Sequence, residues 1–273
     1  MNSQYDIIVV GDSKQGNKVL KLLATANKIL KIAFISSSFK KTTTHDFLNV
    51  EYIKSEVSLV DYKNRLFGCY LANGDRLYCT HLVIATGLHY EPLMINNKQV
   101  PSVFNNTDEI DKLAKHQQAV VFATGDADVK LALQVAKKYK YVYFCISSIT
   151  PNITDKNMKK LANTENLVIL PNTNIAKFKA KENILNTIEL DNYSTLTCSA
   201  IFIKTKSAPE VFFIPDNIIS RDENGYLITS KSLESILVPK CYAVGNCVRK
   251  NTEKMTSAMV EAILKDFGGK YND

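Results

Sequence analysis

A short stretch near the start of the chain combines a buried strand, a tight turn and the beginning of a helix. Residues 7–10 are an unbroken apolar run, which predicts a strand buried on both faces of a parallel sheet. Gly11 follows as the turn residue, and a helix is predicted from Gln15. A second apolar run at residues 32–35 completes a βαβ unit of the length found in mononucleotide-binding folds. The free N–H groups at the start of such a helix favour a phosphate.

The turn carries the spacing Gly-x-Ser-x-x-Gly, formed by Gly11, Ser13 and Gly16. The usual dinucleotide-binding fingerprint has a third glycine at the middle position. Serine is a small replacement that adds a hydroxyl donor. Lys14 lies in the same loop and offers a positive charge to a phosphate. The loop therefore predicts a pyrophosphate site.

Two other strand ends carry small residues that suit contact with a ligand. The second strand ends in Ser36 and Ser37, where an acidic residue usually holds the ribose hydroxyls. Serine also forms hydrogen bonds to ribose, although weaker ones than a carboxylate. A later strand ends in Ala-Thr-Gly, with Thr86 and Gly87 where the backbone passes close to a bound group.

A second βαβ unit is predicted from a strand at 119–123, a helix at 126–137 and a strand at 141–146. Alignment with the first unit indicates an internal repeat. It matches Gly11 with Ala123, Ser13 with Gly125, and Gly16 with Asp128.

The second loop is chemically unsuited to a dinucleotide. Asp126 and Asp128 stand at the start of its helix, where their charges satisfy the helix dipole and repel phosphate. At about 4 Å each like-charge contact costs on the order of 4 kcal/mol. No Asp, Glu or Arg follows the next strand to bind a ribose hydroxyl or a 2′-phosphate. A scaffold without nicotinamide nucleotide binding is therefore favoured.

The remaining segments complete a mixed α/β pattern. Residues 50–60 predict a strand, Asn73-Gly74 predicts a hairpin turn between residues 66–71 and 76–80, and residues 225–228 predict a short strand. Further strands are predicted at 167–170, 176–178, 184–190 and 200–204, with a short helix at 155–163. A last helix at 254–267 is predicted to end at Gly268-Gly269.

Composition narrows the class of protein. The chain has 273 residues, 45% of them hydrophobic, and no apolar run long enough to span a membrane. A strand begins within the first residues, so no signal peptide is expected and the predicted location is cytoplasmic. Six scattered cysteines form no CxxC pair, and the four histidines show no ligand spacing, so neither a disulfide scaffold nor a metal site is predicted. His81 is expected at a surface or at a strand start.

The net charge of +7 has two interpretations. A solvated lysine-rich surface is favoured, and a basic face for an acidic protein partner is the alternative. The lysines are dispersed and lack interleaved aromatic residues, so nucleic-acid binding is not predicted.

Together these segments resemble the two-dinucleotide-domain flavoprotein reductases, and within them the low-molecular-weight thioredoxin reductases. The resemblance covers nearly the whole chain in order. It rests on the loop at 11–16, the Ala-Thr-Gly strand at 82–87, the second βαβ unit at 120–146, the segment 201–209, and Tyr-Ala-Val-Gly-Asn at 242–246. It implies an α/β fold of two Rossmann-like three-layer domains, the second inserted in the first. The implied FAD-binding domain is 1–105 with 212–273, around a degenerate NAD(P)H-binding-like domain at 106–211.

The resemblance also implies FAD as cofactor and, by analogy with the family, a homodimer. The implied FAD residues are Gly11, Ser13, Lys14, Gln15, Gly16, Ser36, Ser37, Thr86, Gly87, Gly245, Asn246, Lys254, Met255 and Thr256. Asn246 stands where the family has an Asp near the ribityl chain, and so keeps a hydrogen bond but loses the charge. Residues 254–256 begin a helix whose positive end would stabilise the anionic reduced flavin.

Several departures from the family limit the activity. No CxxC occurs in the chain. The family usually has its redox-active CxxC just before the second nucleotide fold or within it, whereas this chain has Phe-Asn-Asn-Thr at 104–107 before that fold. The arginines that hold a 2′-phosphate are missing. Cys247 follows the Gly-Asn turn and is the one candidate for a thiol near the flavin, although a small buried side chain is the favoured interpretation. No catalytic acid, base or nucleophile is identified.

Three functions follow from this pattern. The favoured one is an FAD-binding, thioredoxin reductase-like oxidoreductase that uses neither NADPH nor a CxxC disulfide and takes electrons from an acidic donor such as ferredoxin or flavodoxin. The second is a non-catalytic FAD-binding scaffold or binding protein. An NAD(P)H-dependent flavin or ferredoxin reductase is the third.

Overall fold

The chain folds into two units, which the computed structural model describes over residues 2–37, 39, 47–105, 118–147, 153–182 and 184–268. Unit 1 is Met1–His89 with Ser207–Asp273, and unit 2 is Tyr90–Lys206. Unit 2 is therefore inserted in unit 1. The chain leaves unit 1 after His89 and returns at Ser207, earlier than the predicted 105 and 212. The reason is that Val100 packs in a core of unit 2 and β10 (Val103–Phe104) pairs with β17 (Ala200–Ile203).

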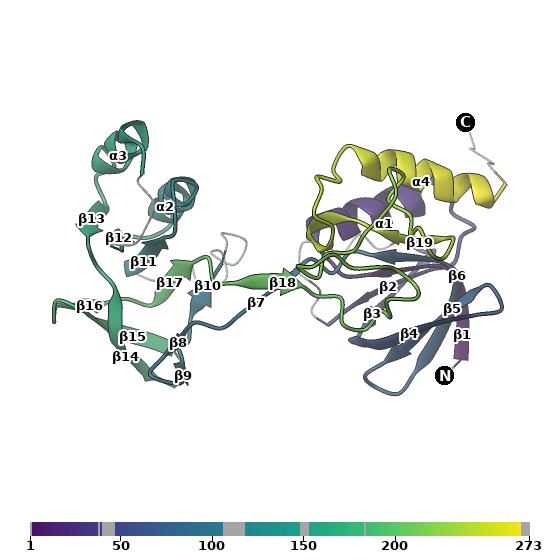
Figure 1. The fold of residues 1–273 in the computed structure, drawn as a ribbon, viewed down its shortest axis with the longest axis horizontal. Coiled ribbons are helices and arrows are strands. Elements are labelled where there is room, and N and C mark those ends of the chain that lie inside the picture. Colours follow the sequence, from purple (N-terminus) through teal and green to yellow (C-terminus); the bar gives the residue numbers. More distant parts are fainter. Residues whose placement is uncertain are drawn as a thin grey trace. The chain divides into compact units, whose positions relative to one another are not determined.

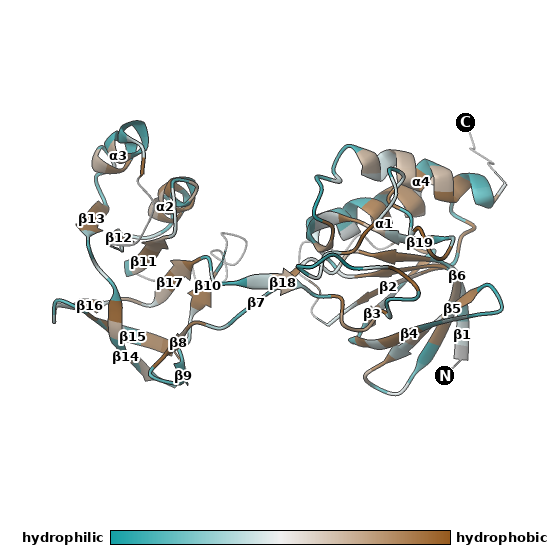
Figure 2. Ribbon diagram, in the orientation of Figure 1, coloured by the Kyte–Doolittle hydropathy of each residue, from teal (hydrophilic) through white to brown (hydrophobic). Residues whose placement is uncertain are grey.

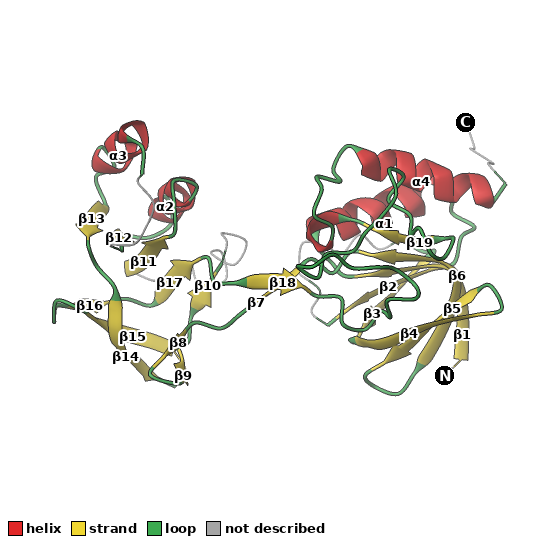
Figure 3. Cartoon of the chain, viewed as in Figure 1, coloured by secondary structure: helices red, strands yellow, loops and turns green. Residues whose placement is uncertain are grey.

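Unit 1 is built on a seven-stranded sheet in the order β3-β2-β1-β6-β5-β4, with β19 also paired to β6 (Figures 1 and 3). Its strands are β1 (Asn2–Val10), β2 (Ile32–Ser36), β3 (Val50–Lys54), β4 (Val57–Lys63), β5 (Leu66–Leu71), β6 (Arg76–Ile84) and β19 (Cys241–Ala243). The predicted strand at 50–60 is wrong, because β3 and β4 are separate strands. β3 pairs in parallel with β2, whereas β4 pairs antiparallel with β5.

The long strand β6 joins two kinds of pairing. It is parallel to β1, and its first half also forms the predicted hairpin with β5 around Asn73-Gly74. Its second half is parallel to β19, with Leu82 opposite Cys241. The carboxyl ends of β1, β2 and β6 therefore lie at the same edge of the sheet.

The apolar run in β1 divides between two cores. Ile7 and Val9 pack with α1 (Lys14–Ala26) and α4 (Met255–Asp266), while Ile8 and Val10 pack with the other face. Successive strand side chains point to opposite faces, so a strand covered on both sides is apolar throughout. α1 and α4 lie side by side over one face (Figure 1), and much of the sheet that they cover is brown, the colour of apolar residues, in Figure 2.

The last helix ends as predicted. Its C-cap is Phe267, and Gly268 follows with φ +76°, a left-handed conformation that favours glycine. Gly269 lies outside the described residues, as do Asn106 and Thr107.

Two local expectations for unit 1 are wrong. Residues 225–228 form an isolated bridge, Leu227 with Arg221, and not a strand. His81 is 1% exposed, because its ring packs under Phe267 while Nε2 lies 3.1 Å from Asp266 Oδ2. Burial lowers the His81 pKa, an effect that the nearby Asp266 carboxylate opposes.

Two short strands carry the chain between the units. β7 (Leu88–Tyr90) and β18 (Ser207–Pro209) pair in a two-stranded sheet.

Unit 2 repeats the parallel arrangement with a five-stranded sheet in the order β10-β17-β11-β12-β13. Its remaining parallel strands and helices are β11 (Gln118–Ala123), α2 (Asp128–Ala136), β12 (Tyr141–Ile146), α3 (Asp155–Ala162) and β13 (Leu167–Pro171). A three-stranded antiparallel sheet packs through Leu185, Ile188 and Leu190 against Val120 and Phe122 of β11.

Unit 2 also contains antiparallel strands. They are β14 (Ile175–Lys181), β15 (Ile184–Leu190) and β16 (Thr195–Thr197), with a separate hairpin of β8 (Met94–Ile95) and β9 (Lys98–Gln99). Within the described part of the chain, none of the helices combines the length and hydrophobicity that crossing a membrane requires.

Candidate nucleotide-binding site

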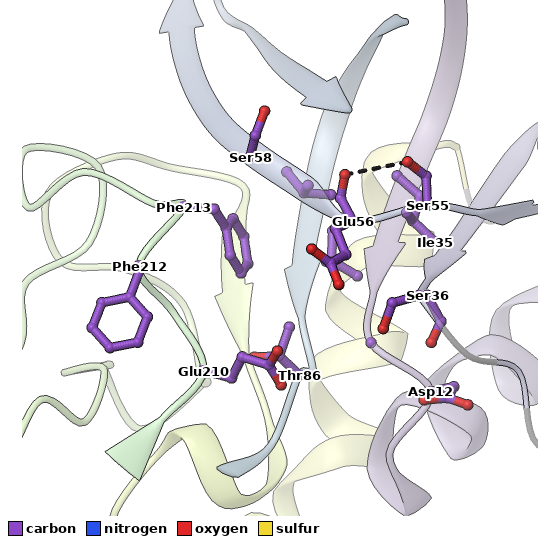
Figure 4. A pocket seen from close by; sticks show the side chains of 14 residues that line it. Asp12, Ile35, Ser36, Ser55, Glu56, Ser58, Thr86, Glu210, Phe212 and Phe213 are labelled. Carbon is purple, nitrogen blue, oxygen red and sulfur yellow. Dashed lines mark hydrogen bonds between the residues drawn. The ribbon is translucent and has the colours of Figure 1, made fainter. Parts of the chain in front are cut away.

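Unit 1 contains a cavity of about 350 Å³ at the carboxyl edge of its sheet (Figure 4). We call it the sheet-edge pocket. It is lined by Val10, Gly11, Asp12, Ile35, Ser36, Ser37, Ser55, Glu56, Val57, Ser58, Thr86, Glu210, Phe212 and Phe213. Of the predicted cofactor residues it includes Gly11, Ser36, Ser37 and Thr86.

Backbone hydrogen bonds between neighbouring strand ends form the floor of the pocket. Gly11 N–H donates to Ile35 O at 2.8 Å, and Ala85 N–H donates to Val10 O at 2.7 Å. Ser55 N–H donates to Ser36 O at 3.0 Å. The ends of β1, β2, β3 and β6 are thereby held together, which is where ligands bind in open parallel sheets.

The two outer glycines of the loop are required by close packing of the chain on itself. Gly11 has φ +102°, and a methyl group there would lie 2.5 Å from the backbone of Ala85. A methyl group on Gly16 would lie 2.1 Å from the carbonyl oxygen of Gly11. Both distances are far inside van der Waals contact, so the turn closes only with glycine at these positions.

The start of α1 is partly capped by its own side chain. Ser13 is the N-cap, and its hydroxyl accepts a hydrogen bond from Gly16 N–H at 3.2 Å. No acidic residue stands in the first turn, so the positive end of the helix dipole is not neutralised there. Lys14 is 86% exposed at its side chain and lies 3.4 Å from Glu253, so its charge is shared with that carboxylate.

One buried side-chain oxygen in the pocket, Oγ1 of Thr86, is left unsatisfied by the protein. Thr86 Oγ1 is buried and, among the described residues, has no hydrogen-bond partner. A buried hydroxyl without a partner costs about 1–3 kcal/mol, so such an atom in a ligand pocket points to a ligand that satisfies it. It lies beside Gly11, at the end of the strand that the sequence singles out.

Other predicted cofactor residues form a second group beside the pocket, at the start of α4. The Gln15 side chain lies against Gly245 and accepts a hydrogen bond from Thr256 Oγ1 at 3.1 Å. Gly245 N–H donates to Thr252 Oγ1 at 2.8 Å. Thr256 is fully buried, so its hydroxyl holds α1 to α4.

The remaining predicted residues do not line the sheet-edge pocket. Asn246 and Lys254 are exposed, Met255 is half-buried as the first residue of α4, and Gly87 has φ +87° with open space around it. The structure therefore brings only part of the predicted set into two groups, one that lines the pocket and one at the start of α4.

Several pocket residues were missed by the sequence analysis. Glu56 lies in the connection between β3 and β4, Ser58 lies in β4, and Glu210, Phe212 and Phe213 come from the returning segment. Arg221 donates to the carbonyl oxygens of Val211 and Ile214, which fixes that segment. Asp12 also lines the pocket and lies within the recognised loop, between Gly11 and Ser13, but it was not among the predicted site residues.

Cys247 is buried and is not part of the pocket. Its thiol donates to Val244 O at 3.1 Å, and burial raises the pKa of Cys247 to about 12. Such a thiol is almost entirely protonated near neutral pH, which argues against a redox role. All six cysteines are free and buried, and Cys69 lies opposite Leu77 of β6, two residues from Cys79. Among the described residues no cluster of His, Cys, Asp or Glu has the makings of a metal site.

The corresponding loop in unit 2 is filled by a carboxylate. Asp128, the first residue of α2, is 1% exposed and accepts hydrogen bonds from Thr124 N–H at 2.8 Å and Thr124 Oγ1 at 2.7 Å. Lys204 Nζ lies 2.8 Å from its other oxygen. Burial opposes ionisation, but these bonds from Lys204 and Thr124 outweigh it and lower the Asp128 pKa.

Asp126 closes the same loop onto α3. Its carboxylate accepts hydrogen bonds from Thr154 N–H at 3.0 Å and Asn157 Nδ2 at 2.7 Å. The Asn157 and Thr154 bonds lower the Asp126 pKa. Both carboxylates are thus ionised, partnered groups at the start of a helix.

The predicted alignment of the two loops is displaced. α1 begins at Lys14, but α2 begins at Asp128, two residues later than the alignment requires. By position in the fold, Asp128 therefore corresponds to Lys14, and N-cap Ala127 corresponds to N-cap Ser13. The loop between strand and helix is one residue longer in unit 2.

Comparison with known proteins gives a family for this arrangement. The family model for pyridine nucleotide-disulphide oxidoreductases matches residues 2–262. The chain belongs to this family. It is similar to a thioredoxin reductase of Chlamydia trachomatis serovar D, with 22% identity over 224 residues, covering 76% of this chain and 69% of that protein.

Two solved structures have the same fold. Thioredoxin reductase from Lactococcus lactis superposes with a TM-score of 0.71 at 16% identity, covering 96% of this chain and 98% of that one. The enzyme from T. acidophilum superposes with a TM-score of 0.72 at 14% identity, covering 97% and 99%. The predicted thioredoxin reductase-like fold is therefore confirmed.

FAD, the cofactor implied by the family, fits the residues of unit 1. The unpartnered Thr86 hydroxyl and the α1 start, free of acidic side chains in its first turn, suit a diphosphate beside Gly11. Ser36 and Ser37 line the same cavity and offer hydroxyls to a ribose.

Proposed function

We propose that this protein is an FAD-binding oxidoreductase that receives its electrons from an acidic protein donor and not from NAD(P)H. The cofactor would be held by Gly11, Ser13, Ser36, Ser37 and Thr86 in unit 1. When bound, FAD supplies the capacity to accept and pass on electrons. The observation that carries the proposal is the contrast between the sheet-edge pocket and the filled loop of unit 2.

The filled loop supports the exclusion of NAD(P)H. A dinucleotide would need to bring its diphosphate to the start of α2, where Asp128 already satisfies Thr124. Its negative charge would also face the ionised carboxylates of Asp126 and Asp128. Separating Asp128 from Lys204 would leave the buried carboxylate of Asp128 without its cationic partner, which makes displacement by a ligand costly.

An acidic electron-transfer protein such as ferredoxin or flavodoxin suits the charge of the chain. The net charge is +7, and β14 presents three exposed lysines, Lys177, Lys179 and Lys181. Lys177 is paired with Glu189 at 3.0 Å. Complementary charge speeds association between such partners. We also propose a homodimer, on the family resemblance alone.

Absorbance spectroscopy on the full chain tests the proposal. Added FAD is expected to bind and to co-elute on a desalting column, and excess NADH or NADPH is expected to leave the flavin band unbleached under anaerobic conditions. Reduced ferredoxin is expected to bleach it, at a rate that falls as salt rises. Failure to take up FAD contradicts the proposal.

A non-catalytic FAD-binding protein is the competing function. The buried Cys247 and the lack of any CxxC favour it. It predicts FAD uptake without bleaching by reduced ferredoxin or flavodoxin, whereas rapid, saturable bleaching by NADPH would instead favour an NAD(P)H-dependent reductase.

A further inference from the structure

We infer that Glu56 is the residue that recognises the ribose of the bound nucleotide, through hydrogen bonds from the vicinal 2′- and 3′-hydroxyls. This inference rests on the proposed binding of FAD. Glu56 lies in the connection between β3 and β4. It is one strand away from the end of β2, where an acidic residue usually holds ribose. In this chain that position holds Ser36 and Ser37.

The pairing of β2 with β3 brings Glu56 to the vacated position. Ser36 lies opposite Lys54 in the parallel register, and Ser55 N–H donates to Ser36 O at 3.0 Å. Glu56 is the next residue. The strand break between β3 and β4 therefore sets a glutamate beside the two serines, at the edge where parallel strands present ligands.

The Glu56 side chain is directed into the sheet-edge pocket. Figure 4 shows its carboxylate between Phe213 and Ser36, above Thr86. The side chain is exposed, and among the described residues its carboxylate forms neither a hydrogen bond nor an ion pair. A carboxylate has two oxygens that accept hydrogen bonds, which suits a pair of neighbouring hydroxyls.

An aromatic side chain at the pocket supports a nucleoside over other hydroxyl-bearing ligands. Phe212 lines the pocket but is 83% exposed, so burial in the protein does not explain it. Aromatic rings stack on nucleobases. A ring for the base and a carboxylate for the sugar, both lining the same pocket as Gly11 of the β1–α1 loop, match the groups of an adenosine diphosphate.

Calorimetric titration of the full chain with ADP, 2′-deoxy-ADP and IDP tests the inference. ADP is the half of FAD that would occupy this pocket, and IDP differs from it only in the base, where a carbonyl replaces the amino group of adenine and N1 carries a proton. ADP is expected to bind about tenfold more tightly than 2′-deoxy-ADP, the size of one hydrogen bond to a charged group. IDP is expected to bind like ADP.

The variant Glu56→Gln is expected to weaken ADP about tenfold and to abolish the preference over 2′-deoxy-ADP. Glu210→Gln is the matched control, because it removes an equal charge from the same pocket and is expected to keep the preference. Thermal unfolding of each variant checks that it folds.

Three results would overturn the inference. They are an unchanged preference in Glu56→Gln, tighter ADP binding in that variant through loss of charge repulsion alone, and loss of IDP binding without loss of 2′-deoxy-ADP binding. If neither FAD nor ADP binds, the proposed function fails as well; if both bind without discrimination by the ribose, only the role of Glu56 fails.

Discussion

The strand-to-helix loops of the two units solve the same electrostatic problem in opposite ways. In unit 1 the loop of Gly11–Gly16 is closed by glycine packing, its first helical turn has no acidic residue, and a buried Thr86 hydroxyl is left without a partner. In unit 2 the loop is closed by Asp128, which takes hydrogen bonds from Thr124 and an ion pair from Lys204.

A nucleotide-binding fold can therefore lose a ligand and keep its shape. A helix start needs a negative or hydrogen-bond-accepting group, and either a phosphate or a side chain meets that need. Once Asp128 meets it from within the chain, unit 2 no longer depends on a ligand at that position. Unit 1 still has unmet polar groups there.

The largest effect is expected from Gly16→Ala. The added methyl would meet the Gly11 carbonyl at 2.1 Å, so the β1–α1 turn would have to open, at about 3 kcal/mol of unfolding free energy. FAD binding should be lost as well. Gly125→Ala in unit 2 is the control, since nothing lies within 4 Å of a methyl there. Chemical denaturation measures the free energy of unfolding of both variants. An equal loss of stability in Gly16→Ala and Gly125→Ala would show that the two loops do not differ in this respect.

Asp128→Ala is expected to destabilise unit 2 by about 2 kcal/mol. It leaves Thr124 and Lys204 without their partner, although Lys204 is 46% exposed and regains water, which reduces the loss. Unit 1 should be unaffected, so FAD binding should persist. Hydrogen exchange resolved by segment measures the loss in α2 and β11. Protection unchanged in unit 2 would contradict the assigned role of this ion pair.

The same carboxylate predicts a pH dependence. Because the folded pKa of Asp128 is lowered, its contribution is fully present above the unfolded pKa, near 4, and is lost as pH falls through the folded pKa. Asp128→Asn should therefore flatten the acid-side loss of stability in unit 2. Hydrogen exchange resolved by segment, measured between neutral pH and about pH 3, records this loss of stability in the wild type and in the variant. A variant as acid-sensitive as the wild type would rule out this residue as the source.

Thr86→Val tests the unpartnered hydroxyl of unit 1. Valine has nearly the same shape, so stability should stay the same or rise slightly, while FAD affinity should fall about tenfold. Thr86→Ser should restore binding. Thr229→Val is the control, because Thr229 Oγ1 is also buried without a partner but does not line the pocket. Unchanged FAD affinity in Thr86→Val would mean that the hydroxyl serves no ligand.

Lys14→Gln is expected to have the smallest effect. The Lys14 side chain is largely exposed and forms an ion pair with Glu253. The free energy of unfolding should therefore change by less than about 0.5 kcal/mol, and FAD affinity by about threefold at most. Glu253→Gln should strengthen FAD binding by a similar factor. A large loss in Lys14→Gln would show that this charge, and not the pocket, dominates binding in unit 1.

Much of the fold could be predicted because its signals are local. A few neighbouring residues are enough to indicate the apolar runs of β1 and β2, the Asn-Gly hairpin and the second βαβ unit. β12 and β15 occur at the predicted bounds. The break between β3 and β4 could not be predicted from local sequence, because it depends on which strands pair across the sheet. The domain boundary failed likewise, because only pairing with β17 assigns β10 to unit 2.

The candidate site divides in the same way. Gly11, Ser36, Ser37 and Thr86 belong to recognisable strand ends and do line the pocket. Glu56 and Phe212 carry no local motif, and they reach the pocket only through strand register and the returning segment. Asp128 was singled out from its charge, but its ion pair with Lys204 joins residues far apart in the chain.

Anaerobic titration of the FAD-loaded chain with NADPH tests whether unit 1 binds FAD while unit 2 no longer binds a nicotinamide nucleotide. Dithionite serves as the reference for full reduction. The account predicts that FAD binds and that its absorbance band survives excess NADPH but disappears on addition of dithionite. Rapid, saturable bleaching by NADPH, or a chain that takes up no FAD, would contradict it.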